Sequence, residues 1–565
     1  MTIQPWVKSY PPNVRWNAPL DLSSVQSVLE QAVERFGQQP ALDFMGKRTS
    51  YAELDALANR TAAGFQKLGV KPGVHVGLFL PNTPHYVIAF FGVLKAGGAV
   101  VNYSPLDALT TLQLKVNDSE TDILVTLDLA ALYPQAEKLI GSTRLKTLIV
   151  GEFAEMTPAP GPVKAQMSAA GMLADVRRDD RHVAFRDLAD NDGRYQIHPL
   201  GNLGDELAVI QYTGGTTGSP KGAMLTHANL TAACSLYTEV MTRSEDGLRV
   251  GEERVLCILP LFHIYSLTVV MLLGFRLGAE LVLHPRFDPA AALKDIVEKK
   301  ITVYLGVPTM HVALLSVPGV EKMDLSSLRL CGSGGALLPV AVQERFEKAV
   351  GCKLGEGWGM TETSPIGTFT PREGPRKPGS CGVPYPGTEM KFVDVADPER
   401  EVKPGERGEI CVKGPNVMKG YWKQPKATAD SMTSDGFFRT GDVGYMDEDG
   451  YVFIVDRTKD MLLCGGFNVY PRNIEEAIYQ HPSVEEVSVI GVPDAYRGET
   501  PKAFVKLKAG AAAPTFEEMK AFLRDRLGKH EMIGAMEIRA ELPKTPVGKI
   551  SKKDLRASDA SAKVA

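Results

Sequence analysis

The sequence predicts an α/β fold: a large N-terminal domain of mostly parallel sheets with helices plus a small β-barrel-like part, and a smaller mobile α+β C-terminal domain. Three observations predict it. Short apolar runs alternate with amphipathic helical patterns along the first 455 residues, which is typical of parallel sheets covered by helices. Between residues 379 and 447, short β-like runs are separated by glycine. Beyond residue 460, the pattern indicates a compact unit with a core of its own.

The alternation begins near the N-terminus. Residues 76–105 have the pattern of strand, helix and strand, and Ser50 and Glu53 have the spacing of a capping box that starts another helix. The same alternation returns in residues 303–351. Ligands of such sheets bind where loops leave the carboxyl ends of the strands, so we expect the functional site at that edge.

A change of pattern places the domain boundary at Asp456. The chain then divides into a large domain, a hinge, a small domain and a disordered tail (residues 1–455, 456–459, 460–556 and 557–565). In the small domain, Thr515 and Glu518 have capping-box spacing and predict the start of a helix.

The composition is typical of a globular cytoplasmic protein. A net charge of −4 over 565 residues, with no block of lysine and arginine, argues against a nucleic-acid binder. The seven cysteines form no CxxC pair and are expected to be reduced thiols, and the histidines form no metal-ligand cluster. The N-terminus lacks the apolar core of a signal peptide. Pro260 and His263 interrupt the apolar run of residues 255–275, which favours a buried strand and helix over a transmembrane anchor.

A loop rich in glycine and threonine occupies residues 211–225, which read QYTGGTTGSPKGAML. The backbone N–H groups of such a loop can surround an anion, and its threonine hydroxyls add donors. The spacing is not that of a Walker A loop, because Lys221 follows Pro220 and precedes Gly222. These residues alone are compatible with a phosphate site or with a plain turn.

This loop resembles the signature loop of the AMP-forming acyl-adenylating superfamily, which includes acyl-CoA ligases, luciferases and peptide-synthetase adenylation domains. Further segments match the other signatures of that family in the same order: residues 259–267, 331–339, 355–365, 435–460, 465–478 and 543–556. The residues of these motifs are most similar to those of bacterial medium- and long-chain fatty acyl-CoA ligases.

The resemblance implies an AMP-forming acid–thiol ligase that uses ATP, a fatty acid and CoA, with Mg²⁺ as cofactor and an acyl-adenylate as intermediate. It implies a catalytic group of Lys549, Thr361, Glu362 and His263, in which Glu362 also holds the metal. The residues that it implies for ATP and AMP binding are Thr213, Gly214, Gly215, Thr216, Thr217, Gly218, Lys221, Gly334, Gly335, Ala336, Glu356, Gly357, Trp358, Thr361, Asp442 and Arg457. Trp358 stands where the family usually has tyrosine, and an indole can equally stack on adenine.

The resemblance also implies a moving small domain. Asp456 is its hinge residue, and Gly465, Gly466 and Tyr470 would lie on the CoA side in a second arrangement. The PKTPVGK segment resembles the arrangement around which lysines of this family are acetylated, so a protein lysine acetyltransferase acting on Lys549 is a further hypothesis. A homodimer and transient peripheral contact with a membrane are hypotheses of the same kind.

Two alternatives stay open. The same chemistry could act on a dicarboxylic or aromatic acid, with Arg276, His284 and Arg286 as candidates to receive a second carboxylate. The alternative of a different class is a non-catalytic fatty-acid binding or transport partner. The presence of Lys549 and Glu362 argues against it, because such a protein need not keep them.

Overall fold

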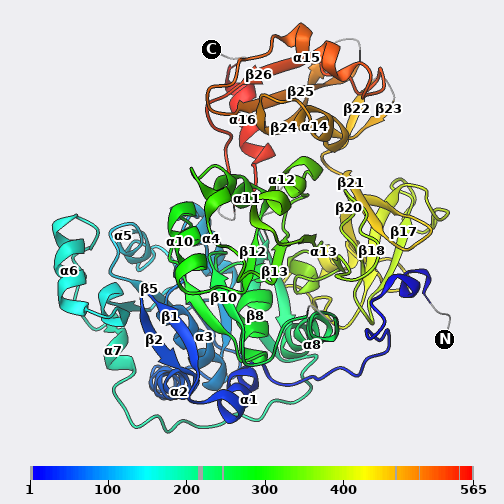
Figure 1. Ribbon diagram of the computed structural model, residues 1–565. Helices are drawn as coiled ribbons and strands as arrows, with labels where there is room; N and C mark the ends of the chain where they lie inside the picture. Colours follow the sequence, from blue (N-terminus) through cyan, green and yellow to red (C-terminus); the bar gives the residue numbers. More distant parts are fainter. Residues whose placement is uncertain are drawn as a thin grey trace.

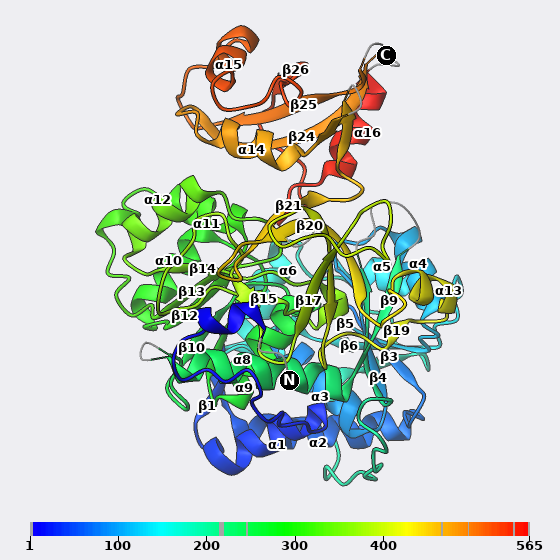
Figure 2. The same ribbon diagram turned by 90° about the vertical axis from the view of Figure 1, so that its right-hand side faces the viewer.

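The computed structural model describes residues 4–213, 220–244, 247–464, 467–494, 497–545 and 548–562. The small C-terminal domain, coloured orange to red, stands against one end of the large domain (Figure 1). The turned view shows the same two bodies, with strand β21 (Val452–Arg457) at the connection between them (Figure 2). The predicted division into a large and a small domain therefore appears in the structure as two separate sets of sheets and helices.

One sheet of the large domain holds the strands that flank the glycine- and threonine-rich loop. Its order is β19 (Gly420–Tyr421), β9 (Lys221–Thr226), β8 (Leu207–Thr213), β4 (Ala99–Asn102), β3 (His75–Leu78), β5 (Ile123–Leu127), β6 (Thr147–Gly151) and β7 (His182–Ala184). From β8 to β7 all neighbours are parallel, whereas β9 pairs antiparallel with β8 and β19. The residues of β3, β4 and β5 are buried, as expected for parallel strands covered on both faces.

A second, largely parallel sheet lies beside the first. Its order is β14 (Leu354–Glu356), β13 (Leu330–Ser333), β12 (Val303–Gly306), β10 (Arg254–Cys257), β11 (Glu280–Leu283), β1 (Pro40–Phe44) and β2 (Lys47–Ser50). Only β2 pairs antiparallel among these described strands. The loops that leave the carboxyl ends of β12, β13 and β14 line the main cavity, which is the edge that the sequence indicates.

Helices cover these sheets (Figure 1). They are α1 (Val25–Phe36), α2 (Tyr51–Lys67), α3 (Pro84–Lys95), α4 (Leu109–Asp118), α5 (Tyr133–Glu137), α6 (Pro160–Ala169), α7 (Phe185–Leu188), α8 (His227–Arg243), α9 (Leu273–Arg276), α10 (Pro289–Glu298), α11 (Pro308–Leu315), α12 (Val340–Val350) and α13 (Pro425–Asp430). The shorter helical turns are Pro5–Ser9, Phe153–Met156, Val320–Lys322 and Thr361–Thr363. The capping box of Ser50 and Glu53 is confirmed at the start of α2.

The apolar run of residues 255–275 forms β10, a buried π-helix (Ser266–Leu272) and α9. This confirms the interpretation as a strand followed by a core helix. Within the described part of the chain, the model contains no helix with the length and apolar character that a membrane span requires.

The remaining part of the large domain is antiparallel. Strands β17 (Glu389–Val393), β18 (Gly408–Lys413), β20 (Phe438–Met446) and β21 form one sheet, and β15 (Thr368–Phe369) pairs with β16 (Val383–Pro384). This sheet lies where the sequence predicts the small β-barrel-like part. Its last strand, β21, contains Asp456 and runs into the small domain, so the predicted hinge begins within a paired strand.

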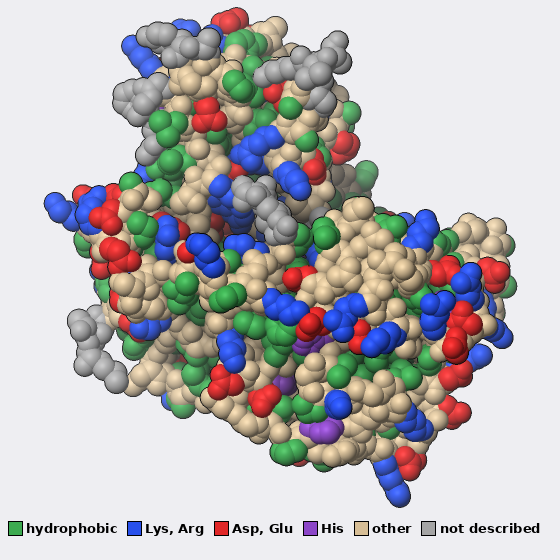
Figure 3. Space-filling view, turned by 180° about the vertical axis from the view of Figure 1, so that it is seen from behind, with side chains coloured by type: hydrophobic (Ala, Val, Ile, Leu, Met, Phe, Trp, Pro, Cys, Tyr) green, Lys and Arg blue, Asp and Glu red, His purple; other side chains and the backbone are tan. Residues whose placement is uncertain are grey.

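The small domain is an α+β unit with its own core. Its sheet contains β22 (Leu462–Cys464), β23 (Phe467–Val469), β24 (Val484–Asp494), β25 (Gly498–Leu507) and β26 (Ala535–Ile538), packed with α14 (Pro471–Tyr479), α15 (Phe516–Leu523) and α16 (Lys552–Ala562). The capping box of Thr515 and Glu518 is confirmed at the start of α15. Seen from behind, lysine and arginine side chains gather where the two domains meet (Figure 3).

The prediction of a disordered tail from residue 557 is wrong over most of its length, because α16 continues to Ala562. The side chain of Leu555 is fully buried and packs in a cluster with Ile490, Phe504 and Leu542. One turn later, the carboxylate of Asp559 lies 2.6 Å from the Lys502 ammonium. The small and polar residues of the segment suggested disorder, but these two tertiary contacts hold the helix on the sheet.

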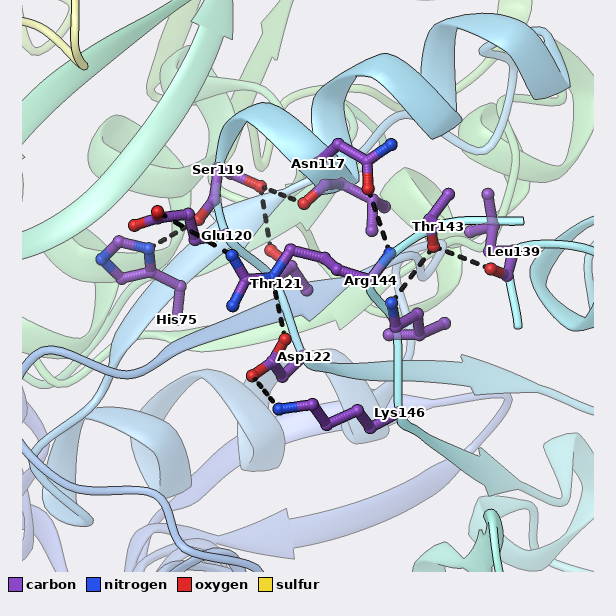
Figure 4. Close-up of polar contacts among 12 residues, drawn as sticks. His75, Asn117, Ser119, Glu120, Thr121, Asp122, Leu139, Thr143, Arg144 and Lys146 are labelled. Carbon is purple, nitrogen blue, oxygen red and sulfur yellow. Dashed lines mark hydrogen bonds and ion pairs between the residues drawn. The ribbon is translucent and has the colours of Figure 1, made fainter. Parts of the chain in front are cut away.

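Polar contacts join the start of β3 to the segments that precede β5 and β6 (Figure 4). The Nδ1 atom of His75 lies 2.6 Å from the Ser119 carbonyl oxygen, and Arg144 donates to Asp122 at 2.8 Å. Next to this network, the hydroxyl of Tyr212 donates to the Asp118 carboxylate at 2.6 Å. The end of β8, where the loop begins, is thereby tied to α4.

We predict that Leu555→Ala lowers the free energy of unfolding of the small domain by about 2–5 kcal/mol, because it removes a fully buried side chain from the contact of α16 with the sheet. Hydrogen exchange of the β24 and β25 amides measures this loss. Lys553→Ala, on the exposed face of the same helix, is the control and should change stability by less than about 0.5 kcal/mol. Equal effects of the two substitutions would show that α16 is not docked as described.

Candidate active site

A cavity of about 1650 Å³ lies between the large and the small domain. The structure brings nearly all described residues of the sequence-derived site to its wall. These are Thr213, Lys221, His263, Gly334, Gly335, Ala336, Glu356, Gly357, Trp358, Thr361, Glu362, Asp442, Asp456, Arg457 and Lys549. They come from both domains and from segments far apart in the chain.

Glu362 lies in the helical turn Thr361–Thr363, and its side chain is buried. The hydroxyl of Tyr421 donates to its carboxylate at 2.8 Å, and the ammonium of Lys221 lies 4.8 Å from the centre of the Tyr421 ring. Burial raises the pKa of Glu362. A cation that enters the cavity would therefore stabilise the ionised carboxylate.

The residues around Glu362 fit a Mg²⁺ ion that also takes ligands from a substrate. In the described part of the chain, no group of three histidine, cysteine, aspartate or glutamate side chains could hold a metal by itself. Mg²⁺ is commonly bound by one or two carboxylates together with waters and substrate phosphates. One buried carboxylate in the wall of the main cavity suits that manner of binding.

Asp442 is held from two sides in β20. The indole Nε1 of Trp358 donates to its Oδ2 atom at 2.7 Å, and the Nε of Arg457 lies 3.1 Å from its Oδ1 atom. The ion pair with Asp442 raises the pKa of Arg457. The orientation of the Asp442 carboxylate is thus fixed, while both oxygens keep lone pairs that could accept hydroxyl groups of a ligand.

Lys549 enters the cavity from the small domain. A methyl group built on Gly335 would lie 3.0 Å from the Lys549 Cε atom, and Gly335 has a left-handed φ of 76°, so a residue other than glycine there would be both strained and crowded. The hydroxyl of Thr309, in α11, donates to the Gly548 carbonyl at 2.6 Å and ties the loop to the large domain. Burial and then the charge of Arg457 lower the pKa of Lys549 to about 8.

His263 faces the same space. Burial and then the charge of Lys549 lower its pKa to about 3, so its imidazole is neutral at physiological pH. The Nδ1 atom of His263 accepts a hydrogen bond from the Tyr265 backbone N–H at 3.3 Å. His263 can therefore position or exchange a proton without adding positive charge beside Lys549.

Glu356 is a second buried carboxylate in the cavity wall. The backbone N–H of Leu338 donates to it at 3.0 Å, and burial raises its pKa to about 7. The backbone N–H of its neighbour Gly357 donates to the Ser333 carbonyl at 3.0 Å. This bond joins the Thr-Glu motif (residues 355–365) to the adenine-side loop (residues 331–339), the segment that the family resemblance places beside adenine.

Some sequence-derived residues are not at the cavity or lie outside the described residues. Gly214, Gly215, Thr216, Thr217, Gly218, Gly465 and Gly466 belong to the segments that the structure leaves undescribed. Thr213 and Lys221, at the two ends of the first segment, face each other across β8 and β9. Tyr470 does not line the cavity in this arrangement, because it packs with Val443 and Val455.

The candidates for a second carboxylate site are also placed elsewhere. Arg276 pairs with Asp21 at 2.6 Å, and His284 pairs with Asp295 at 2.9 Å. Neither these two residues nor Arg286 line the cavity. Asp21 is 255 positions from Arg276 and Asp295 is 11 positions from His284, and the sequence pattern reveals neither pairing.

The sequence motifs miss two residues that shape the site. Tyr421, the partner of Glu362, reaches it because β19 pairs with β9. Thr309, the partner of Gly548, follows the carboxyl end of β12 at the start of α11. The position of Thr309 after a strand was a usable signal, whereas nothing in the sequence near Tyr421 indicates its role.

Comparisons with known proteins agree with this geometry. The family described as AMP-binding enzyme matches residues 29–422, and the AMP-binding enzyme C-terminal domain matches residues 473–549. Among solved structures, an anthranilate CoA ligase in complex with anthranoyl-AMP has a TM-score of 0.85 and 26% identity, with 97% of this chain and 99% of that chain covered.

Similar sequences extend over nearly the whole chain. A long-chain-fatty-acid–CoA ligase of Bacillus subtilis is 40% identical, and one of Escherichia coli O6:H1 is 38% identical, each over 98% of this chain and 97% of the relative. A feruloyl-CoA synthase of Amycolatopsis sp. is 36% identical over 90% of this chain and 94% of the relative. With two matching family domains and relatives of this identity along its length, the protein belongs to the AMP-binding enzyme family.

Proposed function

We propose that the protein is a fatty acid–CoA ligase that forms an acyl-adenylate from ATP and a medium- or long-chain fatty acid and then transfers the acyl group to CoA. The observation that carries the proposal is the position of Lys549. It reaches from the small domain to Gly335 of the adenine-side loop, in the cavity that also holds Glu362 and Asp442. The fatty acid–CoA ligases of Bacillus subtilis and Escherichia coli support the choice of acid.

In the first step, a carboxylate oxygen attacks the α-phosphorus of ATP, and the bond from that phosphorus to the bridging oxygen breaks, so that pyrophosphate leaves. Two negative groups must approach each other, which requires fixed positive charge at the point of contact. Lys549 and Arg457 supply such charge in the cavity. Asp442 would accept hydroxyl groups of the ribose, and Trp358 and Gly335 would enclose the adenine.

Mg²⁺ forms part of this proposal. When bound, it would add positive charge at the phosphates, and Glu362 would be the carboxylate that holds it. Lys221 would contact the β- and γ-phosphates, because its ammonium lies over the ring of Tyr421, the partner of Glu362. The family resemblance assigns the loop before Lys221 to the same phosphates.

We predict that Lys549→Ala slows adenylation by about 10²–10³, because it removes a preorganised cation from the transition state. Pyrophosphate release measures adenylation. Thioester formation from a supplied acyl-adenylate should fall far less, because in that step no anion attacks the α-phosphorus. Lys544→Ala is the control, because Lys544 lies in the same segment but does not line the cavity and pairs with Glu486 at 2.7 Å.

The same experiment has a pH readout. Lys549 is charged below its pKa of about 8, so kcat/KM for ATP should be high below that pH and fall as the pH rises through it. Lys549→Arg should move this fall to higher pH, because a guanidinium stays protonated. Equal losses in both half-reactions, or an unchanged alkaline limb in the arginine variant, would contradict the role of Lys549.

We predict that Trp358→Phe raises KM for ATP by about 10-fold or more, because hydrogen bonds to charged groups are worth about 1.5–3 kcal/mol and Asp442 loses one. Trp422→Phe is the matched control, since the Trp422 indole donates to the Asp118 carbonyl at 3.0 Å away from the cavity. With 2′-deoxy- and 3′-deoxy-ATP, the penalty of Trp358→Phe should shrink. An undiminished penalty would mean that Trp358 acts on the base alone.

The second step requires the CoA sulfur to attack the acyl carbonyl while AMP leaves, and Lys549 fills part of the approach in this arrangement. We propose that the small domain turns about Asp456 between the two steps, which would bring Gly465, Gly466 and Tyr470 to the CoA side. In the present arrangement, the Asp456 carboxylate accepts hydrogen bonds from the Arg457 and Arg472 backbone N–H groups at 2.8 and 3.1 Å.

We predict that Asp456→Pro spares adenylation but abolishes thioester formation, because proline fixes the φ angle that the turn must change. Asp456→Ala is the control: it removes the same carboxylate but leaves the backbone free. Separate assays of pyrophosphate release and acyl-CoA formation give the result. Comparable thioester formation by the two variants would remove Asp456 from the hinge.

Three further hypotheses belong to the same proposal. Acetylation of Lys549 by a protein lysine acetyltransferase would remove the charge on which adenylation depends. Its lowered pKa favours the reactive neutral amine. We also propose that the protein works in the cytoplasm and forms a homodimer. Transient contact with a membrane surface would bring it to fatty acids, which partition there.

A further inference from the structure

Three tyrosines line the main cavity away from Lys221 and Glu362. They are Tyr237 in α8, Tyr265 before the π-helix and Tyr385 after β16. The rings of Tyr237 and Tyr385 stack with centroids 5.8 Å apart. The Tyr265 ring lies against the adenine-side loop, since a methyl group built on Gly334 would be 3.1 Å from it. We call these three residues the tyrosine cluster.

No hydrogen bond joins any hydroxyl of the tyrosine cluster to another described residue. Burial raises the pKa of all three, so each phenol stays protonated and able to donate. After burial, Tyr237 also contributes to the raised pKa of both Tyr265 and Tyr385.

Buried tyrosines elsewhere in the protein are paired. The hydroxyl of Tyr86 donates to Asn102 and to the Leu261 carbonyl, each at 2.8 Å, and that of Tyr51 donates to the Ala279 carbonyl at 2.6 Å. Native structures leave few buried polar groups without a partner. The hydroxyl oxygens of the tyrosine cluster differ, because they are not among the described buried atoms that lack a partner and so face the open cavity. A ligand that fills the cavity would become their partner.

Met241 and Val269, each four residues after a tyrosine of the cluster, line the same cavity. The cluster therefore adjoins apolar wall, and in the proposed function the tail of the acid would lie there. A plain alkyl chain would displace water from the hydroxyls and leave them unpaired, which costs free energy. An oxygen on the tail would accept their hydrogen bonds. Building on the proposed function, we propose that the acyl end of the cavity selects carboxylic acids whose tail carries a hydrogen-bonding oxygen, as a hydroxyl or as a second carboxylate.

Arg372 offers a way to distinguish a hydroxyl from a second carboxylate on the tail, because a guanidinium would pair with a carboxylate. It lines the same cavity, and no described carboxylate lies within ion-pair distance of its guanidinium. One of its NH₂ groups donates to the Arg329 carbonyl at 3.0 Å, while its Nε atom is buried without a partner. Burial raises the pKa of Tyr237, and the charge of Arg372, which lines the same cavity, opposes that effect.

The test measures kcat/KM by pyrophosphate release with matched acids. The panel contains octanoate, decanoate and dodecanoate, their ω-hydroxy and ω-carboxy forms, and the pair cinnamate and 4-hydroxycinnamate. We expect at least one oxygenated acid to exceed its plain counterpart by about 10-fold or more, as sites built to bind a substrate hydroxyl reject the analogue without it. Preference for the plain acid in every pair would overturn the inference.

Substitution then connects the preference to the tyrosine cluster. Tyr237→Phe, Tyr265→Phe and Tyr385→Phe each remove one hydroxyl and keep the ring, so at least one of them should lower the ratio of oxygenated to plain acid by about 10-fold. Tyr195→Phe is the control, because Tyr195 does not line the cavity. An unchanged ratio in all three variants would overturn the inference.

Arg372→Gln separates the two kinds of acid. If the unsubstituted enzyme prefers ω-carboxy acids and Arg372→Gln abolishes that preference, the tail oxygen is a second carboxylate. If the unsubstituted enzyme prefers only ω-hydroxy acids and Arg372→Gln keeps that preference, the tail oxygen is a hydroxyl. Failure of the proposed function has a different outcome, since no acid of the panel would then release pyrophosphate. Activity with plain acids only would leave the ligase proposal standing and remove the selection by the tyrosine cluster.

Discussion

The site depends on one charge that crosses between domains, the ammonium of Lys549. Burial and the nearby guanidinium of Arg457 both disfavour this charge, and they lower the pKa of Lys549 to about 8. Asp442 opposes them, but it already pairs with Arg457. The cavity thus holds more positive charge near Asp442 than that carboxylate balances, which suits an anionic ligand. A nucleotide would supply the missing negative charge.

The same charge links the binding of a ligand to the position of the small domain. The loop that carries Lys549 is held by the hydrogen bond from Thr309 to the Gly548 carbonyl, and the connection between the domains is held at Asp456. In the proposed reaction this interface opens between the two steps. When the charge of pyrophosphate leaves, Lys549 would lose part of the negative charge that favours its burial. The electrostatics of the first step would then favour the proposed movement of the small domain.

Local patterns are where the sequence was most informative. The capping boxes at Ser50 and Thr515 need only residues three positions apart, and both form as predicted. The strand–helix alternation likewise gave the parallel sheets and the edge that carries the site. The family resemblance spans both domains, so it predicted Lys549 and Glu362 as members of one catalytic group. Spacing alone would not have joined them.

Contacts between distant segments are what the sequence could not give. Tyr421 meets Glu362 only because a short strand adds to the edge of a sheet. The end of α16 is helical because Leu555 finds a pocket on the small domain, although its own composition favours disorder. Arg276 pairs with Asp21 and His284 pairs with Asp295, so neither residue is available to bind a second carboxylate of a substrate. In each case a partner from another element of the fold decides the role of the residue.

The two ends of the cavity differ in the kind of polarity that they offer. Around Glu362, Asp442 and Lys549 the groups are ionisable, and their charges respond to one another. At the tyrosine cluster the groups are neutral hydroxyls that keep their protons. Neutral hydroxyls, unlike the guanidinium of Arg372 in the same cavity, add no charge to the field at the reacting carboxylate. Neutral phenols can recognise an oxygen on the tail while leaving that field to Lys549.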